Sequence, residues 1–259
     1  MSESNRVWAR RMVVGLAILG LLVIAGCSGG SLNRPKSASY SFSILLEKNL
    51  DTQSDYLSLE FLRNDSAFAG GFVLVDADTI RVGATGRVDT TYAKKKWLFA
   101  HTVAIKAIDT SKAFKYQTSV VMPDSFGISN LIPNTHQWQP NKANPRIEWT
   151  GSAGAAGYIA AIMPRGHGSA APGQAVVAGS TRSQTFTPTA FNNPQNNQIV
   201  PDVYYIHVVA YAPTFVVRPG ANYGIPVTSF PLTVDTPEIT GAVSAAVVSA
   251  RDTLTVSPL

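Results

Sequence analysis

The stretch Tyr204-Tyr205-Ile206-His207-Val208-Val209-Ala210 determines the class of fold that we expect for this chain. Side chains alternate between the two faces of a β-strand, so every second residue from Tyr204 to Ala210 lies on one face. That face carries only aromatic, branched and small apolar side chains. The pattern indicates a strand that covers a hydrophobic core.

Similar short runs recur along the chain, and no window after Cys27 shows the 3.6-residue period of a capped helix. Because crossover helices are missing, a parallel α/β sheet is disfavoured, and strands at this spacing favour a sandwich. We therefore predict an all-β chain with two β-sandwich domains in tandem. In the first half we expect strands over residues 40–46, 56–63, 71–75, 79–82, 97–108 and 115–122.

Three motifs in the second half occur in a recognisable order. They are Pro145-Arg146-Ile147-Glu148-Trp149, the small-residue turn and strand of residues 154–162, and the stretch 204–210. Together they resemble a bacterial fibronectin type III domain over about residues 143–235. The resemblance implies that Trp149, Tyr158 and Tyr204 are core residues, and that the Tyr204 hydroxyl bonds back to nearby backbone as a tyrosine corner. Residues 199–201 lie about one residue closer to Tyr204 than the family pattern expects.

Proline and asparagine are dense between residues 123 and 145, which indicates a linker or a wrapped connection. We place a domain boundary near Thr135. The expected organisation is a β-sandwich at 39–135, similar by analogy to an immunoglobulin-like fold, and a fibronectin type III-like sandwich at 136–236. Residues 237–259 form a tail or an extra strand. Within that tail, residues 241–248 could be a strand or a short helix, because periodicity does not decide.

The N-terminus has the pattern of an export signal. Arg6, Arg10 and Arg11 precede an uncharged run over residues 12–25, which is short for a membrane span but right for a signal peptide. The run ends in Ile24-Ala25-Gly26-Cys27, which resembles the lipobox of bacterial lipoproteins.

This resemblance implies a signal peptide at 1–26, recognised by its peptidase through Ile24, Ala25 and Gly26. It also implies acylation of Cys27, with palmitate or a similar chain, and membrane attachment through the acyl chains. Residues 27–38 would be a flexible tether, and Ser28 favours the outer membrane. The alternative is an uncleaved anchor in which Cys27 is incidental.

Composition excludes several classes of protein. The chain has 259 residues, 14% of them charged, and a formal net charge of +5. Such a low charged fraction argues against nucleic acid as a partner. The single cysteine excludes an internal disulfide framework and a cysteine-cluster metal site.

Residues with the chemistry of catalysis or metal binding are sparse. The four histidines, His101, His136, His167 and His207, show no metal-ligand spacing, and Gly166-His167-Gly168-Ser169 lacks the full nucleophile-elbow pattern. Asp76 and Asp78, with Asp89, could hold calcium, although turn chemistry is the stronger interpretation. We predict no catalytic residue, no metal and no cofactor.

Two tryptophans are candidate ligand contacts. Trp97 follows Lys94-Lys95-Lys96, and Trp138 lies in the proline-rich segment, where packing is the competing interpretation. The loops 165–173 and 192–198 could contribute further contacts. The expected function is a non-catalytic, lipid-anchored envelope protein that presents β-sandwiches for binding or as a spacer. The alternative is a carbohydrate or surface-polymer binding lipoprotein of a glycan-uptake system.

Overall fold

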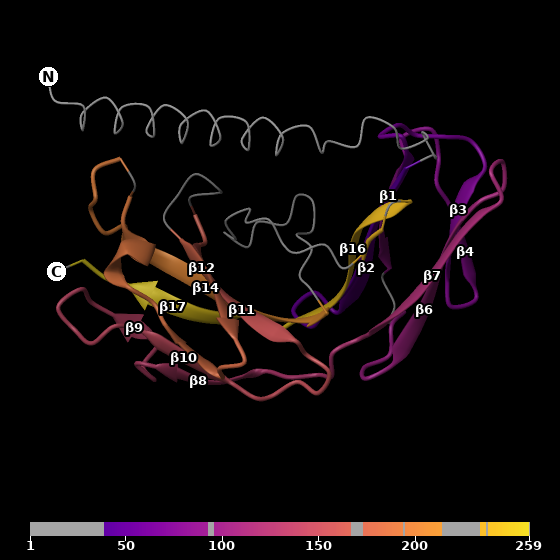
Figure 1. Ribbon diagram of the computed structural model, residues 1–259. Helices are drawn as coiled ribbons and strands as arrows, with labels where there is room; N and C mark the ends of the chain where they lie inside the picture. The colour runs from indigo at the N-terminus through magenta and orange to yellow at the C-terminus, as the bar shows by residue number, and fades with distance from the viewer. Residues whose placement is uncertain are drawn as a thin grey trace, which may run out of the picture. The chain divides into compact units, whose positions relative to one another are not determined.

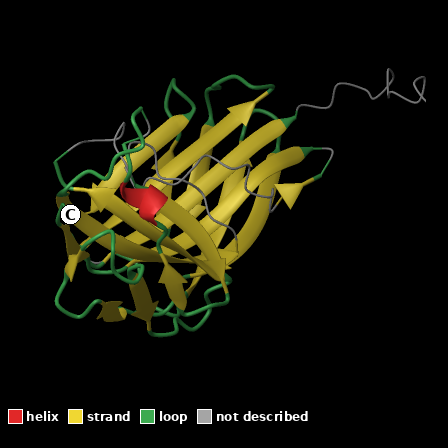
Figure 2. Ribbon diagram, turned by 90° about the vertical axis from the view of Figure 1, so that its left-hand side faces the viewer, coloured by secondary structure: helices red, strands yellow, loops and turns green. Residues whose placement is uncertain are grey.

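The computed structural model describes residues 39–92, 96–166, 173–193, 195–213, 234–236 and 238–258 (Figure 1). These residues are built almost entirely of strands and loops (Figure 2). One 3₁₀ helix, η2, covers Pro188–Phe191. The strands are β1 (Tyr40–Asn49), β2 (Ser54–Arg63), β3 (Gly71–Val75), β4 (Asp78–Arg81), β5 (Arg87–Tyr92), β6 (Thr102–Asp109), β7 (Phe114–Val121), β8 (Ile128–Ile132), β9 (Gln137–Trp138), β10 (Arg146–Trp149), β11 (Gly157–Pro164), β12 (Gln174–Gly179), β13 (Ser183–Thr185), β14 (Asp202–Pro213), β15 (Val234–Asp235), β16 (Ile239–Val248) and β17 (Asp252–Val256).

The predicted fold class is confirmed: the described residues are all-β and their strands form sandwiches. In the first sandwich, the sheet β4-β3-β6-β7 packs against β1, β2 and β5. Apolar side chains at alternate positions meet between the sheets, such as Phe42 and Leu59 from one side and Val73 and Ile105 from the other, all 0% exposed. Period-2 alternation therefore builds this core.

The expected strand over 97–108 begins later than predicted, at Thr102. The reason lies in Asp55, whose side-chain oxygen Oδ2 accepts hydrogen bonds from the backbone N–H groups of Lys96 and Trp97. Because these N–H groups bond to a side chain, they are not available for pairing with a neighbouring strand, and residues 96 and 97 form a loop. Asp55 also forms a buried ion pair with Lys48, at 3.0 Å between Nζ and Oδ1.

In the second sandwich, the three-stranded sheet β13-β10-β8 packs against β12, β11, β14 and β17. This sandwich begins at β8, before residue 136, and takes its last strand from β17, beyond residue 236. The proline-rich segment near Thr135 is where the chain passes from β8 in one sheet to β9 in the other. It therefore marks a change of sheet inside the sandwich.

The two sandwiches share one ten-stranded sheet. Over all ten of its residues β16 pairs in parallel with β1 of the first sandwich, and its end also pairs with β14 of the second. β17 continues along β14 and also pairs with β9. Residues 38–259 accordingly form one compact unit. Of the two C-terminal strands, β16 is common to both sandwiches, whereas β17 belongs to the second sandwich.

A second apolar cluster occupies the other face of this sheet. Its members are each at most 1% exposed: Leu45, Ile159, Ala161, Val209, Ala246 and Val248. Their neighbours in sequence, such as Val208 and Val247, point into the main core. The central strands of the shared sheet are therefore apolar on both faces.

Candidate functional site

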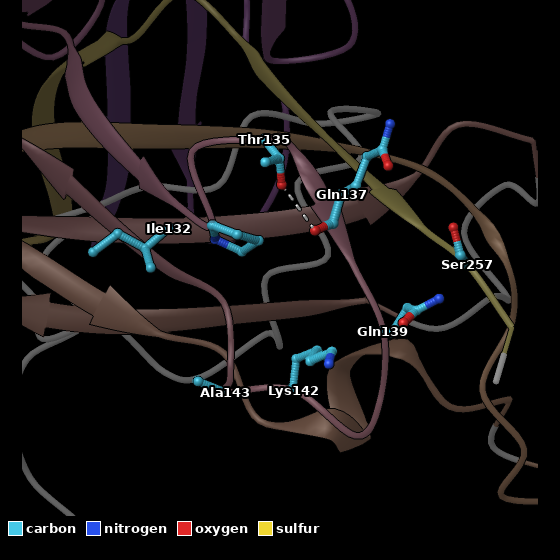
Figure 3. A pocket seen from close by; sticks show the side chains of 8 residues that line it. Ile132, Thr135, Gln137, Gln139, Lys142, Ala143 and Ser257 are labelled. Atoms are coloured by element: carbon cyan, nitrogen blue, oxygen red, sulfur yellow. Dashed lines mark hydrogen bonds between the residues drawn. The ribbon is translucent and has the colours of Figure 1, made fainter.

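A cleft of about 580 Å³ opens where the chain passes from β8 to β9 (Figure 3). We call it the Gln137 cleft. Its lining residues are Ile132, Pro133, Thr135, Gln137, Gln139, Lys142, Ala143 and Ser257.

The local sequence explains how these side chains reach one place. β8 ends at Ile132, and the backbone turns through residues 133–136, where the His136 N–H donates to the Pro133 carbonyl at 3.0 Å. β9 then pairs in parallel with β17, which brings Thr255 beside Gln137. The Ser257 N–H donates to the Trp138 carbonyl at 3.0 Å, so Ser257 joins the cleft from the C-terminal end of the chain.

Alternation along Gln137-Trp138-Gln139 separates core from cleft. Trp138 points inward and is 1% exposed, and its ring lies 4.6 Å from that of Phe191. Its indole N–H donates to the carbonyl of Ala143 at 2.9 Å, which holds the 139–143 loop against the strand. Gln137 and Gln139 are exposed on the cleft side.

Most polar side chains of the cleft form no hydrogen bond or ion pair with other described residues. Thr135 donates to the Gln137 carbonyl at 3.4 Å. Within the part of the chain that the structure describes, the side chains of Gln137, Gln139, Lys142 and Ser257 make no hydrogen bond or ion pair. Among the described lining residues, Lys142 is the one that carries a charge, and none of them is a carboxylate. The cleft therefore offers amide, hydroxyl and ammonium groups to a ligand.

Both tryptophans considered as ligand contacts are buried, so neither ring is open to a ligand, and the burial of Trp138 agrees with the packing interpretation. Trp97 is 4% exposed, its ring lies edge-on to Tyr92 at 5.9 Å between ring centres, and Trp138 is 1% exposed. Each ring fills a core position because its backbone is fixed nearby, by Asp55 for Trp97 and by β17 for Trp138. Of the two loops considered as contacts, residues 167–172 and 194 lie outside the described residues.

The structure places Trp149, Tyr158 and Tyr204 in the core, at 3%, 1% and 0% exposure. The rings of Trp149 and Tyr158 lie 5.7 Å apart. The Tyr204 hydroxyl donates to the Val200 carbonyl at 2.9 Å, which is the tyrosine corner that the family resemblance implies.

The acidic residues considered for calcium are separated. Asp89 accepts hydrogen bonds from the hydroxyls of Tyr56 and Ser58, each at 2.7 Å, whereas Lys96 pairs with Asp78. Burial by itself raises the pKa of Asp89, but the hydrogen bonds from Tyr56 and Ser58 and the charge of Arg87 outweigh it and lower the pKa. In the described ranges, no three His, Cys, Asp or Glu side chains gather closely enough to hold a metal ion.

The histidines take separate positions. His101 lies 3.7 Å from Asp76, and His136 Nδ1 lies 3.1 Å from Asp252. Burial lowers the pKa of His207, which favours its neutral form. His167, Lys94 and Lys95 lie outside the described residues.

The predicted signal peptide, the lipobox with Cys27 and the tether also lie outside the described residues. Among the residues that are described, no helix is both long and apolar enough to cross a membrane.

No protein-family model and no curated protein matches the sequence. Among solved structures, fibronectin(III)-like modules of CbhA from Clostridium thermocellum are 10% identical, over 84% of this chain and 92% of theirs, with a TM-score of 0.27. A tetra-tandem repeat from the extending region of a large adhesion protein is 13% identical, over 84% of this chain and 49% of its own, with a TM-score of 0.23. The D0-D1 domain of intimin is 9% identical, over 82% of this chain and 97% of its own, with a TM-score of 0.23. The strand pairing of this chain, and not these likenesses, defines its fold.

Proposed function

We propose that this chain is a non-catalytic, lipid-anchored protein of the cell envelope that presents two β-sandwiches as one rigid unit. The unit would hold a binding surface, or act as a spacer, at a fixed distance from a membrane. The outer membrane is the proposed location.

The shared C-terminal strand is the observation that supports this proposal most strongly. β16 pairs with β1 of the first sandwich along its whole length, and its last five residues also pair with β14 of the second. A flexible linker between sandwiches would let each move independently, because interfaces between domains are commonly small and mobile. A strand paired into both sandwiches resists such motion, since bending there would break ladder hydrogen bonds.

The anchor is supported by the sequence alone. The run over residues 12–25 and the lipobox Ile24-Ala25-Gly26-Cys27 have the order that lipoprotein processing requires. Acyl chains on Cys27 would give stable attachment, because each buried methylene contributes about 0.8 kcal/mol. The proposed partner is therefore the membrane.

Replacing the acylated residue tests the anchor. In Cys27→Ala cells, the protein should move from the membrane fraction to the soluble fraction and should not incorporate labelled palmitate. Ser31→Ala, a neighbouring exchange outside the lipobox, should leave both unchanged. A density gradient of the wild-type membranes should place the protein with the outer membrane. Membrane attachment that persists in the Cys27→Ala cells would contradict the proposal.

A second candidate function, carbohydrate or surface-polymer binding, is favoured by the Gln137 cleft. The amides of Gln137 and Gln139 and the hydroxyl of Ser257, which bond to no other described residue, have the chemistry of glycan recognition, although Trp97 and Trp138 are buried. Retention of the protein on a glycan array would support this function, and retention on no glycan would leave the spacer role.

A further inference from the structure

We infer that the Gln137 cleft binds an acidic oligosaccharide, a segment of a polymer whose sugar units carry hydroxyl and carboxylate groups. This inference rests on the second function proposed above and gives it a location and a chemical class of ligand.

The size of the cleft suits such a ligand. Its volume of about 580 Å³ lies within the roughly 300–1,000 Å³ of common ligand sites. Gln137, Gln139 and Lys142 are all exposed, so the cleft is open at the surface. A polymer could therefore bind through a few of its units while the rest of its chain continues into solvent.

The hydrogen-bonding groups match hydroxyl-rich molecules. Each glutamine amide supplies one acceptor oxygen and two N–H donors, and a sugar hydroxyl can both donate and accept. Gln137 lies in β9 and Gln139 directly follows this strand, and two residues of extended backbone span about 6.6 Å. They can thus contact successive groups along an extended ligand, while Ser257 adds a hydroxyl from the neighbouring strand.

An apolar wall completes the cleft. Ile132, which is 40% exposed, lies with Pro133 and Ala143 among the lining residues (Figure 3). Apolar walls with a few convergent polar groups are typical of ligand sites. The C–H face of a sugar ring can pack on such a wall while its hydroxyls reach the amides.

Charge selects an acidic ligand over a neutral one. Of the lining residues that the structure describes, only Lys142 is charged, and none is Asp or Glu. A carboxylate would gain a charge-assisted hydrogen bond from the ammonium group, which is stronger than a bond between neutral groups. A basic ligand would find no counter-charge among the described lining residues.

Calorimetric titration of the full-length protein, solubilised in a detergent without sugar, tests the inference. The probes are oligogalacturonate, which is acidic, and maltohexaose, which is neutral. The binding variants are Gln137→Ala with Gln139→Ala, and Lys142→Gln. Gln117→Ala and Lys115→Gln are the matched controls, because both residues are exposed on β7 in the first sandwich.

We expect oligogalacturonate to bind more tightly than maltohexaose. Each binding variant should raise the dissociation constant for oligogalacturonate by about tenfold or more. Lys142→Gln should also abolish the preference for the acidic probe. The controls should bind as the wild type does. Lys142 lies on an exposed loop, so Lys142→Gln should fold. This variant therefore tests the cleft even if the double glutamine variant does not fold.

Each other outcome overturns a defined part of the inference. Equal binding of both probes would contradict the acidic class. Binding that the cleft variants leave unchanged would remove the cleft as the site, while glycan binding would stand. Binding of neither probe, together with an empty glycan array, would overturn both the inference and the second function, and would leave the anchor and spacer proposal intact.

Discussion

At Tyr204, one hydrogen bond joins the shared sheet to the loop that precedes it. The hydroxyl donates to the Val200 carbonyl at 2.9 Å, and the ring is fully buried against Phe191 at 5.0 Å. Burial raises the pKa of this hydroxyl, which therefore remains a donor at every physiological pH. Removing it would leave the Val200 carbonyl without this partner.

Because this bond is partly buried, Tyr204→Phe should lower the free energy of unfolding by about 0.5–1.5 kcal/mol, the usual net contribution of one hydrogen bond. Urea unfolding followed by circular dichroism measures the change. Tyr205→Phe is the matched control, because the neighbouring ring points to the other face and has no hydroxyl hydrogen bond in the described structure. An equal effect in both variants would show that the corner bond contributes nothing specific.

A second residue-scale prediction concerns Asp109, which is buried at 0% exposure. Burial by itself would raise its pKa, but hydrogen bonds from Ser111, Tyr40 and Arg63 outweigh burial and lower the pKa below the usual 3.8. The folded protein thus binds a proton at Asp109 less readily than the unfolded chain does. The resulting stability is present above the unfolded pKa and is lost as the pH falls through the folded pKa.

The free energy of unfolding should consequently decline as the pH falls below about 4. Asp109→Asn should be less stable than the wild type at pH 7, because it breaks the 2.7 Å ion pair with Arg63. Its stability should also decline less steeply in acid. Urea titrations from pH 7 to about pH 2.5 compare the two proteins, and parallel curves would contradict this role for Asp109.

The Gln137 cleft could have been partly predicted from sequence at this scale. The triplet Gln137-Trp138-Gln139 has period 2, and applying that period would have turned Trp138 inward and both glutamines outward. The contribution of Ser257 could not have been predicted, because it depends on the parallel pairing of β9 with β17.

At the scale of elements, β16 explains why the tail was ambiguous in sequence. Val243, Ala245 and Val247 point into the main core, whereas Ala246 and Val248 belong to the cluster on the other face. A strand buried on both faces has a continuous apolar run without alternation, and such a run cannot be distinguished from a buried helix by periodicity. Strands β3 and β7 alternate clearly and were predicted close to their observed bounds.

The pairing of β16 with β1 requires a glycine at position 241. Gly241 lies opposite Phe42, and a Cβ atom at this position would overlap the Phe42 carbonyl. Gly241→Ala should therefore push the two strands apart and lower the free energy of unfolding by about 1–3 kcal/mol.

Gly83→Ala is the control for that exchange. A Cβ atom at Gly83 would meet nothing within 4 Å, so the expected change is within about 0.5 kcal/mol. Thermal and urea unfolding of both variants give the comparison. A Gly241→Ala protein as stable as the Gly83→Ala protein would contradict the close approach of β16 and β1.

At the scale of the whole molecule, the sequence indicated two sandwiches but not their connection. Turn residues and alternation are local signals, so they locate strands without showing which distant strands pair. Tyr40 in the first sandwich pairs with Ile239, almost two hundred residues away, so a strand from the end of the chain completes the sheet of the first half. Two sandwiches that share a strand should unfold together, because neither keeps a complete sheet when the other is lost.

Differential scanning calorimetry of the full chain tests this claim most directly. A chain in which β16 joins both sandwiches should unfold in one transition, with a calorimetric enthalpy equal to the van't Hoff enthalpy. Two resolved transitions, or a calorimetric enthalpy about twice the van't Hoff value, would show that the sandwiches unfold independently and would contradict the rigid unit.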